Sequence, residues 1–238
     1  MANTSNNNDD HPHLTVAVEG CCHGELDAIY GTIADAGRRG VHVDVLLICG
    51  DFQCTRNAAD LLCVAVPPKY RRLHNFQDYV TGVKVAPVLT IFIGGNHEAS
   101  NVLHSVYYGG FVAPNIYFLG FAGSVRVGGV RIAGLSGIYN HRHYRVGHYE
   151  LPPYTDDSLR SIYHLRELEV FRMAHLTSPV DIFLSHDWPA GVWEHGDKQR
   201  LLARKSFLRD DMVSGRLGRY RKTYHMDTLM HVPCSASY

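Results

Sequence analysis

The sequence has no long hydrophobic run, no excess of charge of one sign and no internal repeat. Its 238 residues carry 23 basic and 23 acidic side chains, so the formal net charge is zero and no chain-wide field attracts nucleic acid or anionic lipid. No stretch approaches the roughly 18 uninterrupted apolar residues of a membrane span. We therefore expect no membrane partner. The first 13 residues are polar and rich in asparagine, which predicts a disordered tail over 1–13.

A disulfide framework is also missing. The six cysteines have no paired spacing and no secretory leader precedes them, so we expect a soluble protein in a reducing, intracellular setting. The hydrophobic content of 45% and the charged content of 19% are those of a globular protein. A chain of this length fits one large α/β domain.

Short apolar, β-branched runs predict buried strands, and helical patterns lie between several of them. Helices are expected from Leu26 onward, over 57–66 and over 158–175. This alternation indicates the α/β class. Strands are expected over 14–19, 43–49, 87–93, 116–119, 125–127, 130–135 and 180–184.

Polar side chains with metal-binding or acid–base chemistry follow four of these strands. Right-handed crossovers place the carboxyl ends of such strands at one edge of a sheet, and unpaired polar groups buried there are costly unless they bind something. The sequence therefore predicts a site at this edge. Its candidate residues are Cys21 and His23, then Asp51, then Asn96, His97 and Glu98, and finally His186.

Carboxylate, imidazole and amide oxygen ligands suit hard and borderline divalent cations. Asp51 has two oxygens and can face two ions, and a pair of ions about 3.5–4 Å apart binds a phosphoryl group and activates water at neutral pH. His97 is then the candidate general acid. The plainer interpretations are an ordinary polar loop after the strand at 87–93 and, for Cys21, a small buried thiol.

Eight motifs, in order, resemble those of the RNA lariat debranching enzymes, a group within the calcineurin-like metallophosphoesterases. The similarity runs from about residue 14 to residue 218. It implies a single catalytic domain built as a β-sandwich flanked by helices, in αββα layers. The motifs are GCCHGELDAIY, ICGDFQ, GGNHEASN, YFLG, GLSGIYN, PPY, RSIYHLRELEV and SHDWP.

The resemblance implies a nuclear, metal-dependent hydrolase that cleaves the 2′,5′-phosphodiester at the branch point of excised introns during mRNA processing. It assigns Cys21 and His23 to a first metal position, Asp51 to both positions, and Asn96 and His186 to a second. His97 is implied as the general acid, with Glu98 available to orient its ring. The resemblance implies one or two divalent ions, Fe²⁺, Zn²⁺ or Mn²⁺. A cysteine in place of the usual aspartate favours Zn²⁺ or Fe²⁺ at the first position, or leaves that position weakly filled so that a single ion acts.

The segment 139–155 has no useful periodicity and is dense in His, Tyr and Arg, and the resemblance makes it the lariat-recognition loop. Stacking on aromatic rings and guanidinium groups is how proteins hold single-stranded RNA. We expect branched RNA as the partner, no DNA, and a monomer. The expected contacts are Tyr139, Asn140, Arg142, His143, Tyr144, Arg145, His148 and Tyr154.

After Gly218 the resemblance stops, and residues 219–238 read as a diverged basic tail. Members of the group continue to a strand that ends in a His-x-His pair, whereas His225 and His231 are six apart here. We therefore expect a missing strand and a ligand lost from each metal position. Two other hypotheses stay open: an inactive homologue that binds branched RNA without turnover, and an enzyme for another phosphoester.

Overall fold

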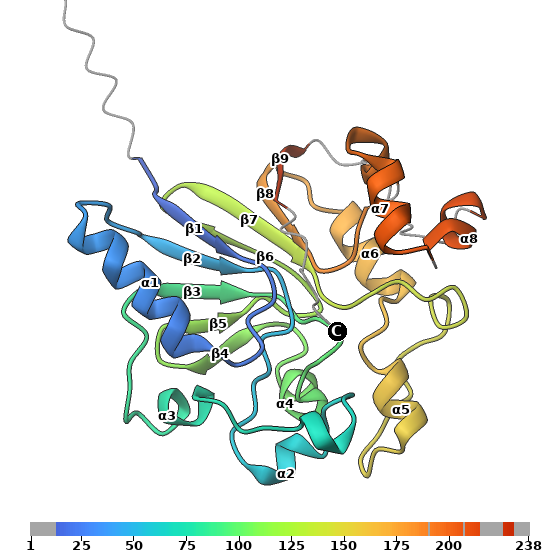
Figure 1. Ribbon diagram of the computed structural model, residues 1–238, viewed down its shortest axis with the longest axis horizontal. Coiled ribbons are helices and arrows are strands. Elements are labelled where there is room, and N and C mark those ends of the chain that lie inside the picture. Colours follow the sequence, from blue (N-terminus) through green and yellow to red (C-terminus); the bar gives the residue numbers. More distant parts are fainter. Residues whose placement is uncertain (1–12, 190, 207, 215–225, 231–238) are drawn as a thin grey trace, which may run out of the picture.

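The computed structural model describes residues 13–189, 191–206, 208–214 and 226–230. Two sheets lie face to face, with helices on the outer side of each (Figure 1). The first sheet has the strand order β1-β2-β3-β5-β4 and the second β6-β7-β8-β9. Their bounds are β1 Val16–Glu19, β2 Val45–Ile48, β3 Leu89–Phe92, β4 Gly110–Ala113, β5 Ile116–Phe118, β6 Ala122–Val127, β7 Val130–Leu135, β8 Val180–Ser185 and β9 Met226–Met230.

The helices that cover the first sheet come from the first half of the chain, and those of the second half lie against or beyond the second sheet (Figure 1). Their bounds are α1 Leu26–Arg38, α2 Ala58–Leu61, the 3₁₀ turn η1 Pro68–Tyr70, α3 Phe76–Val80, α4 Ser100–Ser105, α5 Asp156–Ser161, α6 Glu167–Ala174, the 3₁₀ turn η2 Val192–His195, α7 Lys198–Arg204 and α8 Leu208–Val213.

Successive side chains of a strand point to opposite faces of the sheet, and the apolar ones build three layers. Leu46 and Ile48 of β2 point to the layer shared with α1, α3 and α4. Val45 and Leu47 point the other way, into the layer between the two sheets, where they meet residues of β7 and β8. A third layer joins the far side of the second sheet to α6 through Met173. The predicted αββα architecture is therefore confirmed.

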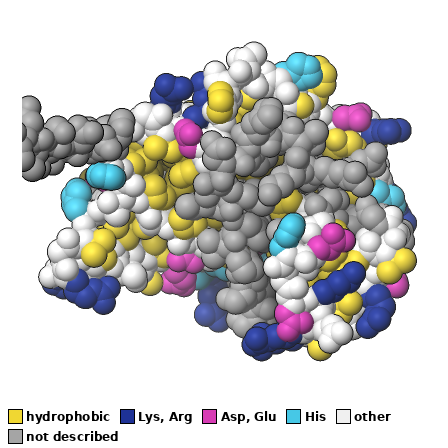
Figure 2. All heavy atoms as spheres, turned by 90° about the horizontal axis from the view of Figure 1, so that it is seen from above, with side chains coloured by type: hydrophobic (Ala, Val, Ile, Leu, Met, Phe, Trp, Pro, Cys, Tyr) yellow, Lys and Arg dark blue, Asp and Glu magenta, His cyan; other side chains and the backbone are white. Residues whose placement is uncertain are grey.

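Strands β1, β2 and β3 are mutually parallel, as are β7, β8 and β9. Their carboxyl ends consequently lie toward the candidate site residues. Among the described residues, no helix is long and apolar enough to cross a membrane. On the face drawn in Figure 2, Lys and Arg side chains lie at several separate places around the outline.

Two predicted helices are shorter than expected. The helix predicted over 158–175 is two helices, because the chain between α5 and α6 bonds to the neighbouring segment instead of continuing the helix. Leu165 N–H donates to the Ile138 carbonyl at 2.9 Å, and His164 forms an isolated bridge with Ile138. The helix predicted over 57–66 begins correctly with Asn57 as its N-cap but ends at Leu61, beyond which tight turns follow.

The second sheet also gains a strand that the sequence did not predict. Backbone of β9 pairs in parallel with β8, with Met226 opposite Val180 and Met230 opposite Leu184. The expected missing strand is thus replaced by one within the tail. His225 and His231, which flank β9 in the sequence, lie outside the described residues, as do residues 1–12 of the predicted tail.

Candidate metal centre

Asp51 stands at the centre of the site, in a loop of unusual backbone conformation after β2. Gly50, Asp51 and Gln53 have φ values of 121°, 46° and 59°, in a region that residues other than glycine rarely occupy. The loop is held by its neighbours: His23 N–H donates to the Asp51 carbonyl at 2.6 Å, and Gly24 N–H to that of Phe52 at 3.1 Å. Such strain, maintained by surrounding bonds, is typical of functional sites.

The two carboxylate oxygens of Asp51 face two groups of side chains. On the Oδ2 side, His23 Nε2 lies 3.8 Å away, and ligand atoms of Cys21, His23 and Asp51 all lie within 4.8 Å of one another. On the Oδ1 side, His186 Nε2 lies 3.5 Å away. Asp51 itself is buried, with 3% of its surface exposed. The carboxylate therefore links two clusters of potential ligands.

The protonation of His186 follows from its bonds. Its Nδ1 lies 3.0 Å from the Cys49 carbonyl, which only accepts, so Nδ1 carries the proton in the neutral ring. Nε2 then presents a lone pair toward Asn96 Oδ1 at 3.1 Å and toward Asp51 Oδ1. Three acceptor atoms converge without a proton between them, which is an arrangement that a cation stabilises.

Two glycines let the chain pass against these donor atoms. A Cβ on Gly95 would lie 2.1 Å from Asp51 Oδ1 and 2.8 Å from His186 Nε2. A Cβ on Gly50 would lie 2.2 Å from His186 Nδ1. No side chain at either position fits unless the ligands move. The donor set and its packing therefore suit one or two divalent metal ions, in agreement with the prediction from sequence.

Comparison with known proteins decides the family. The calcineurin-like phosphoesterase family matches residues 14–214. The chain belongs to this family. Calcineurin-like phosphoesterases use divalent metal ions, and the cluster around Asp51 supplies the ligands that such ions need.

Curated relatives of this phosphoesterase are described as lariat debranching enzymes. The human protein of that name is 54% identical over 94% of this chain, the mouse protein 59% over 86%, and the Drosophila melanogaster protein 58% over 86%. The aligned part is 43%, 38% and 39% of those three proteins. The chain thus spans about two fifths of the length of the curated relatives that it matches.

His97 lies beside the carboxylate of Asp51, as predicted for a residue of the site. Its main-chain N–H donates to Asp51 Oδ1 at 2.8 Å, and its Nδ1 lies 3.5 Å from Oδ2. Burial lowers the pKa of the ring, although the Asp51 charge acts to raise it and His23 and His186 act to lower it further. A negatively charged ligand beside the ring would shift the pKa upward.

Glu98 has a different role from the one predicted. Its two oxygens accept hydrogen bonds from the main-chain N–H groups of Phe52 and Gln53, both at 2.8 Å, and of Gly95 at 3.0 Å. Burial and the nearby Asp51 raise its pKa to about 8, although these three bonds act to lower it. Glu98 is 3% exposed and braces the Asp51 loop, which corrects the expectation that it orients the His97 ring.

A buried polar network fixes the 139–155 loop against the domain. Arg166, only 2% exposed, donates to Glu150 Oε1 at 2.6 Å and to the carbonyl of His143 at 3.0 Å. His148 lies 3.1 Å from Glu169 and 3.5 Å from Glu150. Burial alone would lower the pKa of His148, but the two carboxylates raise it above its ordinary value. The guanidinium of Arg166 therefore holds two points of the loop, the His143 carbonyl and the Glu150 carboxylate.

This network changes the expected set of RNA contacts. Tyr144 is 7% exposed and packs against Tyr139, and the His148 side chain is 14% exposed and enclosed by carboxylates. His143 turns its Nδ1 to His164, 2.7 Å away. We therefore reassign Tyr144, His148 and His143 to holding the loop, because their polar or aromatic surfaces already contact protein.

The other predicted contacts remain accessible to different degrees. Arg142 and Arg145 are exposed, whereas Tyr139, Asn140 and Tyr154 are partly buried. Tyr139 N–H donates to Asp187 at 2.8 Å, which ties the start of the loop to the turn that carries His186. These five residues stay predicted contacts.

Two residues near the site were missed from sequence. Gln53 Nε2 lies 3.4 Å from His23 Nδ1, so it is placed to orient that ring. Tyr163 lines a small pocket with Gly94, Gly95 and Gly137, and its pKa is raised by burial and by the charge of Asp51, with Arg160 opposing. The sequence predicts Tyr163 within a helix, whereas two main-chain hydrogen bonds, from Ile138 N–H to the Tyr163 carbonyl and from Leu165 N–H to the Ile138 carbonyl, place it beside this pocket.

Proposed function

We propose that this chain is a metal-dependent phosphodiesterase that hydrolyses the 2′,5′-phosphodiester at the branch point of lariat RNA. The observation that carries the proposal is Asp51, whose two oxygens face His23 on one side and His186 with Asn96 on the other. The names of the relatives support branched RNA as the substrate. The nucleus, where the resemblance places such an enzyme, stays a prediction.

Cys21, His23 and Asp51 would hold one ion, and Asp51, Asn96 and His186 another. Bound there, a divalent cation supplies charge that polarises the phosphoryl oxygens and lowers the pKa of a coordinated water. The thiol of Cys21 favours Zn²⁺ or Fe²⁺ at the first position, because sulfur prefers softer metals than a second carboxylate does. The identity and number of the ions belong to this proposal.

The residues of the chain account for the rest of the chemistry. Water forms the new bond to phosphorus, the bond from phosphorus to the 2′-oxygen breaks, and His97 gives its proton to that oxygen. The products are a 5′-phosphate and a free 2′-hydroxyl. Asp51 holds His97 in place through the main chain, and Glu98 holds the Asp51 loop, so the acid is fixed relative to the ligands. Arg142 and Arg145 lie exposed on the loop, where they can contact RNA phosphates.

The experiment compares the purified chain with His97→Ala on three substrates: a branched RNA, a linear RNA of the same sequence, and bis(p-nitrophenyl) phosphate. Bound metal is measured by elemental analysis before each assay. We expect conversion of the branched RNA alone to linear product, and a loss of 100-fold or more in His97→Ala, in line with general acid catalysis. Metal content should stay at the wild-type level.

Each alternative outcome has a distinct meaning. Cleavage of bis(p-nitrophenyl) phosphate without cleavage of branched RNA would assign another phosphoester as substrate. Tight binding of branched RNA without turnover, at saturating metal, would support the non-catalytic hypothesis. Full activity of His97→Ala would remove His97 from the mechanism.

A further inference from the structure

A basic segment, residues 68–74, lies outside the site described so far. The sequence from 61 to 77 contains no acidic residue, while Lys69, Arg71, Arg72 and His74 fall within six positions. In the part of the chain that the structure describes, Lys69, Arg71 and Arg72 form no ion pair with a carboxylate. Their positive charge is therefore not neutralised by neighbouring acids.

One end of the basic segment rests on the loop that carries Cys21 and His23. A Cβ on Gly24 would lie 2.7 Å from the Cβ of His74, so the two residues are in direct contact. His74 Nδ1 also pairs with Glu25 at 2.9 Å. Because Gly24 directly follows His23, the basic segment borders the first group of metal ligands.

The middle of the basic segment lies close to the end of the 139–155 loop. Arg71 donates through Nε to the Val66 carbonyl at 3.1 Å, which fixes its guanidinium near Cys63. Burial raises the pKa of Cys63, and the charge of Arg71 acts to lower it. Burial also raises the pKa of Tyr154, with Cys63 and Glu150 adding to the effect. Cys63 is thus within electrostatic reach of both Arg71 and Tyr154.

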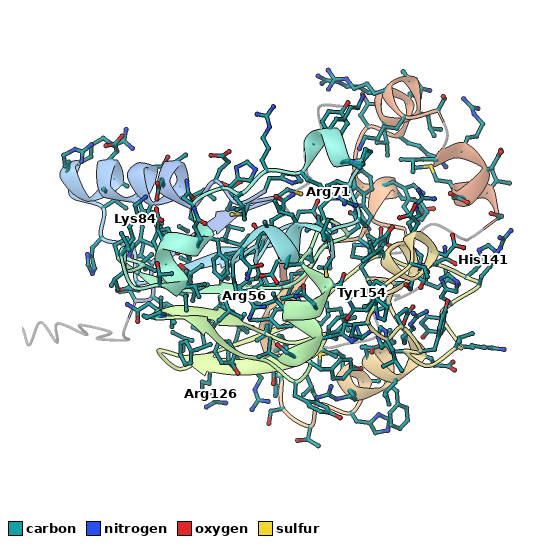
Figure 3. The ribbon with its side chains drawn as sticks, turned by 90° about the horizontal axis from the view of Figure 1, so that it is seen from below. Arg56, Arg71, Lys84, Arg126, His141 and Tyr154 are labelled. Carbon is teal, nitrogen blue, oxygen red and sulfur yellow. The ribbon has the colours of Figure 1, made fainter. Side chains whose placement is uncertain are left out.

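Figure 3 agrees with this placement. In Figure 3, Arg71, Tyr154 and His141 lie on one half of the domain, and Lys84 and Arg126 lie on the other. Lys84 differs chemically as well, because Asp27 and Asp78 both pair with it. The positive charge of Arg71 is therefore on the same half of the domain as the 139–155 loop.

The basic segment also has an accessible aromatic surface. Tyr70 is 51% exposed, and Lys69 Nζ lies 4.7 Å from the centre of its ring. Aromatic rings on which bases stack, next to cations that contact phosphates, are the elements that bind single-stranded RNA without sequence preference. An acidic peptide would use the cations but would gain little from the ring.

We propose that the basic segment binds one single-stranded limb of the branched RNA, next to the loop that carries Cys21 and His23 and near the end of the 139–155 loop. This inference rests on the proposed function. A branch nucleotide has three limbs, and a site bordered by one loop alone would leave at least two of them in solvent. The basic segment forms a second border of the site. There Tyr70 stacks on a base of the limb, and Lys69 and Arg72 contact the phosphates on either side of that base.

The test uses two branched RNAs in which the 2′,5′-linkage is made non-hydrolysable, one with single-nucleotide limbs and one with limbs of eight nucleotides. Dissociation constants are measured by fluorescence anisotropy for wild type and for Lys69→Ala/Arg72→Ala. We expect the double variant to weaken binding of the long-limbed RNA by roughly 25-fold at 0.1 M salt, about fivefold for each lost phosphate contact. The slope of the logarithm of the binding constant against the logarithm of the salt concentration should become shallower by roughly 1.4.

Matched variants separate this effect from a general loss of charge. Arg39→Ala/Arg126→Ala removes the same formal charge, and both of its positions lie at the other end of the strands. It should bind the long-limbed RNA as wild type does. Tyr70→Ala should weaken binding at least fivefold, and Tyr70→Phe should restore it, because the ring and not the hydroxyl makes the contact.

The dependence on limb length decides the inference. If Lys69→Ala/Arg72→Ala lost equal affinity for the short-limbed and the long-limbed RNA, the basic segment would support the fold and not bind a limb. Equal affinities of the two double variants for the long-limbed RNA would also overturn the inference. Either result leaves the proposed function intact when wild type debranches the hydrolysable RNA. Absence of both debranching and branched-RNA binding in wild type would instead reject the proposed function.

Discussion

Replacing Arg166 with methionine should release the 139–155 loop. Methionine keeps most of the side-chain volume but removes the charge and the donors that reach Glu150, His143 and Ser161. Glu150 is 4% exposed and would keep a buried charge without its cation. Burial acts to raise the pKa of Glu150, and bonds from His148, Ser161 and Arg166 hold it well below its ordinary value instead.

The size of the effect follows from this burial. Breaking a buried ion pair by removing one partner costs about 3–5 kcal/mol, since the remaining charge is left unpaired. This is a large part of the roughly 5–15 kcal/mol by which a domain is stable. If the loss falls on the loop alone, its opening becomes more frequent by about 150-fold for 3 kcal/mol.

Two assays distinguish local from global loss. Urea unfolding reports the free energy of the whole domain, and limited trypsin digestion reports opening of the loop, where Arg142 and Arg145 are exposed. When opening is rapid relative to cleavage, the digestion rate follows the open population. We expect cleavage at these two arginines to accelerate by about 100-fold or more.

Arg160→Met is the matched control, because Arg160 is exposed on α5 and the same substitution removes no buried partner. Glu150→Gln in the Arg166→Met background should recover part of the stability by removing the unpaired charge. Equal stability and equal digestion of Arg166→Met and Arg160→Met would refute the assignment of Arg166 as the anchor of the loop.

Two further predictions concern the metal site and the pH dependence. Gly95→Ala should lower bound metal at least tenfold with an unchanged circular dichroism spectrum, because its Cβ displaces Asp51 and His186, whereas Gly147→Ala, whose Cβ meets open space, should retain the metal. Full metal content in Gly95→Ala would contradict this packing. Burial, with His143 and Arg166 nearby, lowers the pKa of His164 to about 4 in the folded state. The stability that it contributes is therefore complete above its unfolded pKa of about 6.5 and is lost as the pH falls toward 4. From pH 7 to pH 5, wild type should lose about 2 kcal/mol more than His164→Gln in urea unfolding. Equal losses would show that His164 takes up its proton without disturbing the fold.

The layers and the ligand residues could be predicted from sequence because each depends on local pattern. Apolar runs mark the strands, and the polar residues that end them must lie at the edge where parallel strands finish. Asp51, His97 and His186 were found in this way, and the structure brings them together.

The remaining features depend on tertiary contacts that no local pattern encodes. The break between α5 and α6 arises from bonds to Ile138, and the same bonds carry Tyr163 to the site. Glu98 was assigned to His97 because the two are adjacent in sequence, but its oxygens bond to a loop 45 and 46 residues away. The composition of the loop predicts RNA contacts at His148 and Tyr144, but the fold buries Tyr144 and places the half-buried His148 between Glu150 and Glu169.

The position of the site between two sheets has a consequence for how the chain matures. Asp51 and Asn96 follow strands of the first sheet, while His186 follows β8 of the second and bonds to Cys49 across 137 positions of sequence. An intermediate that has formed only the first sheet holds Cys21, His23, Asp51 and Asn96 but lacks His186. The metal position that includes His186 should therefore fill late in folding, after the sheets have closed on each other, and an ion bound there should stabilise only the closed state. The rate at which this position acquires its ion during refolding would then measure sheet closure directly.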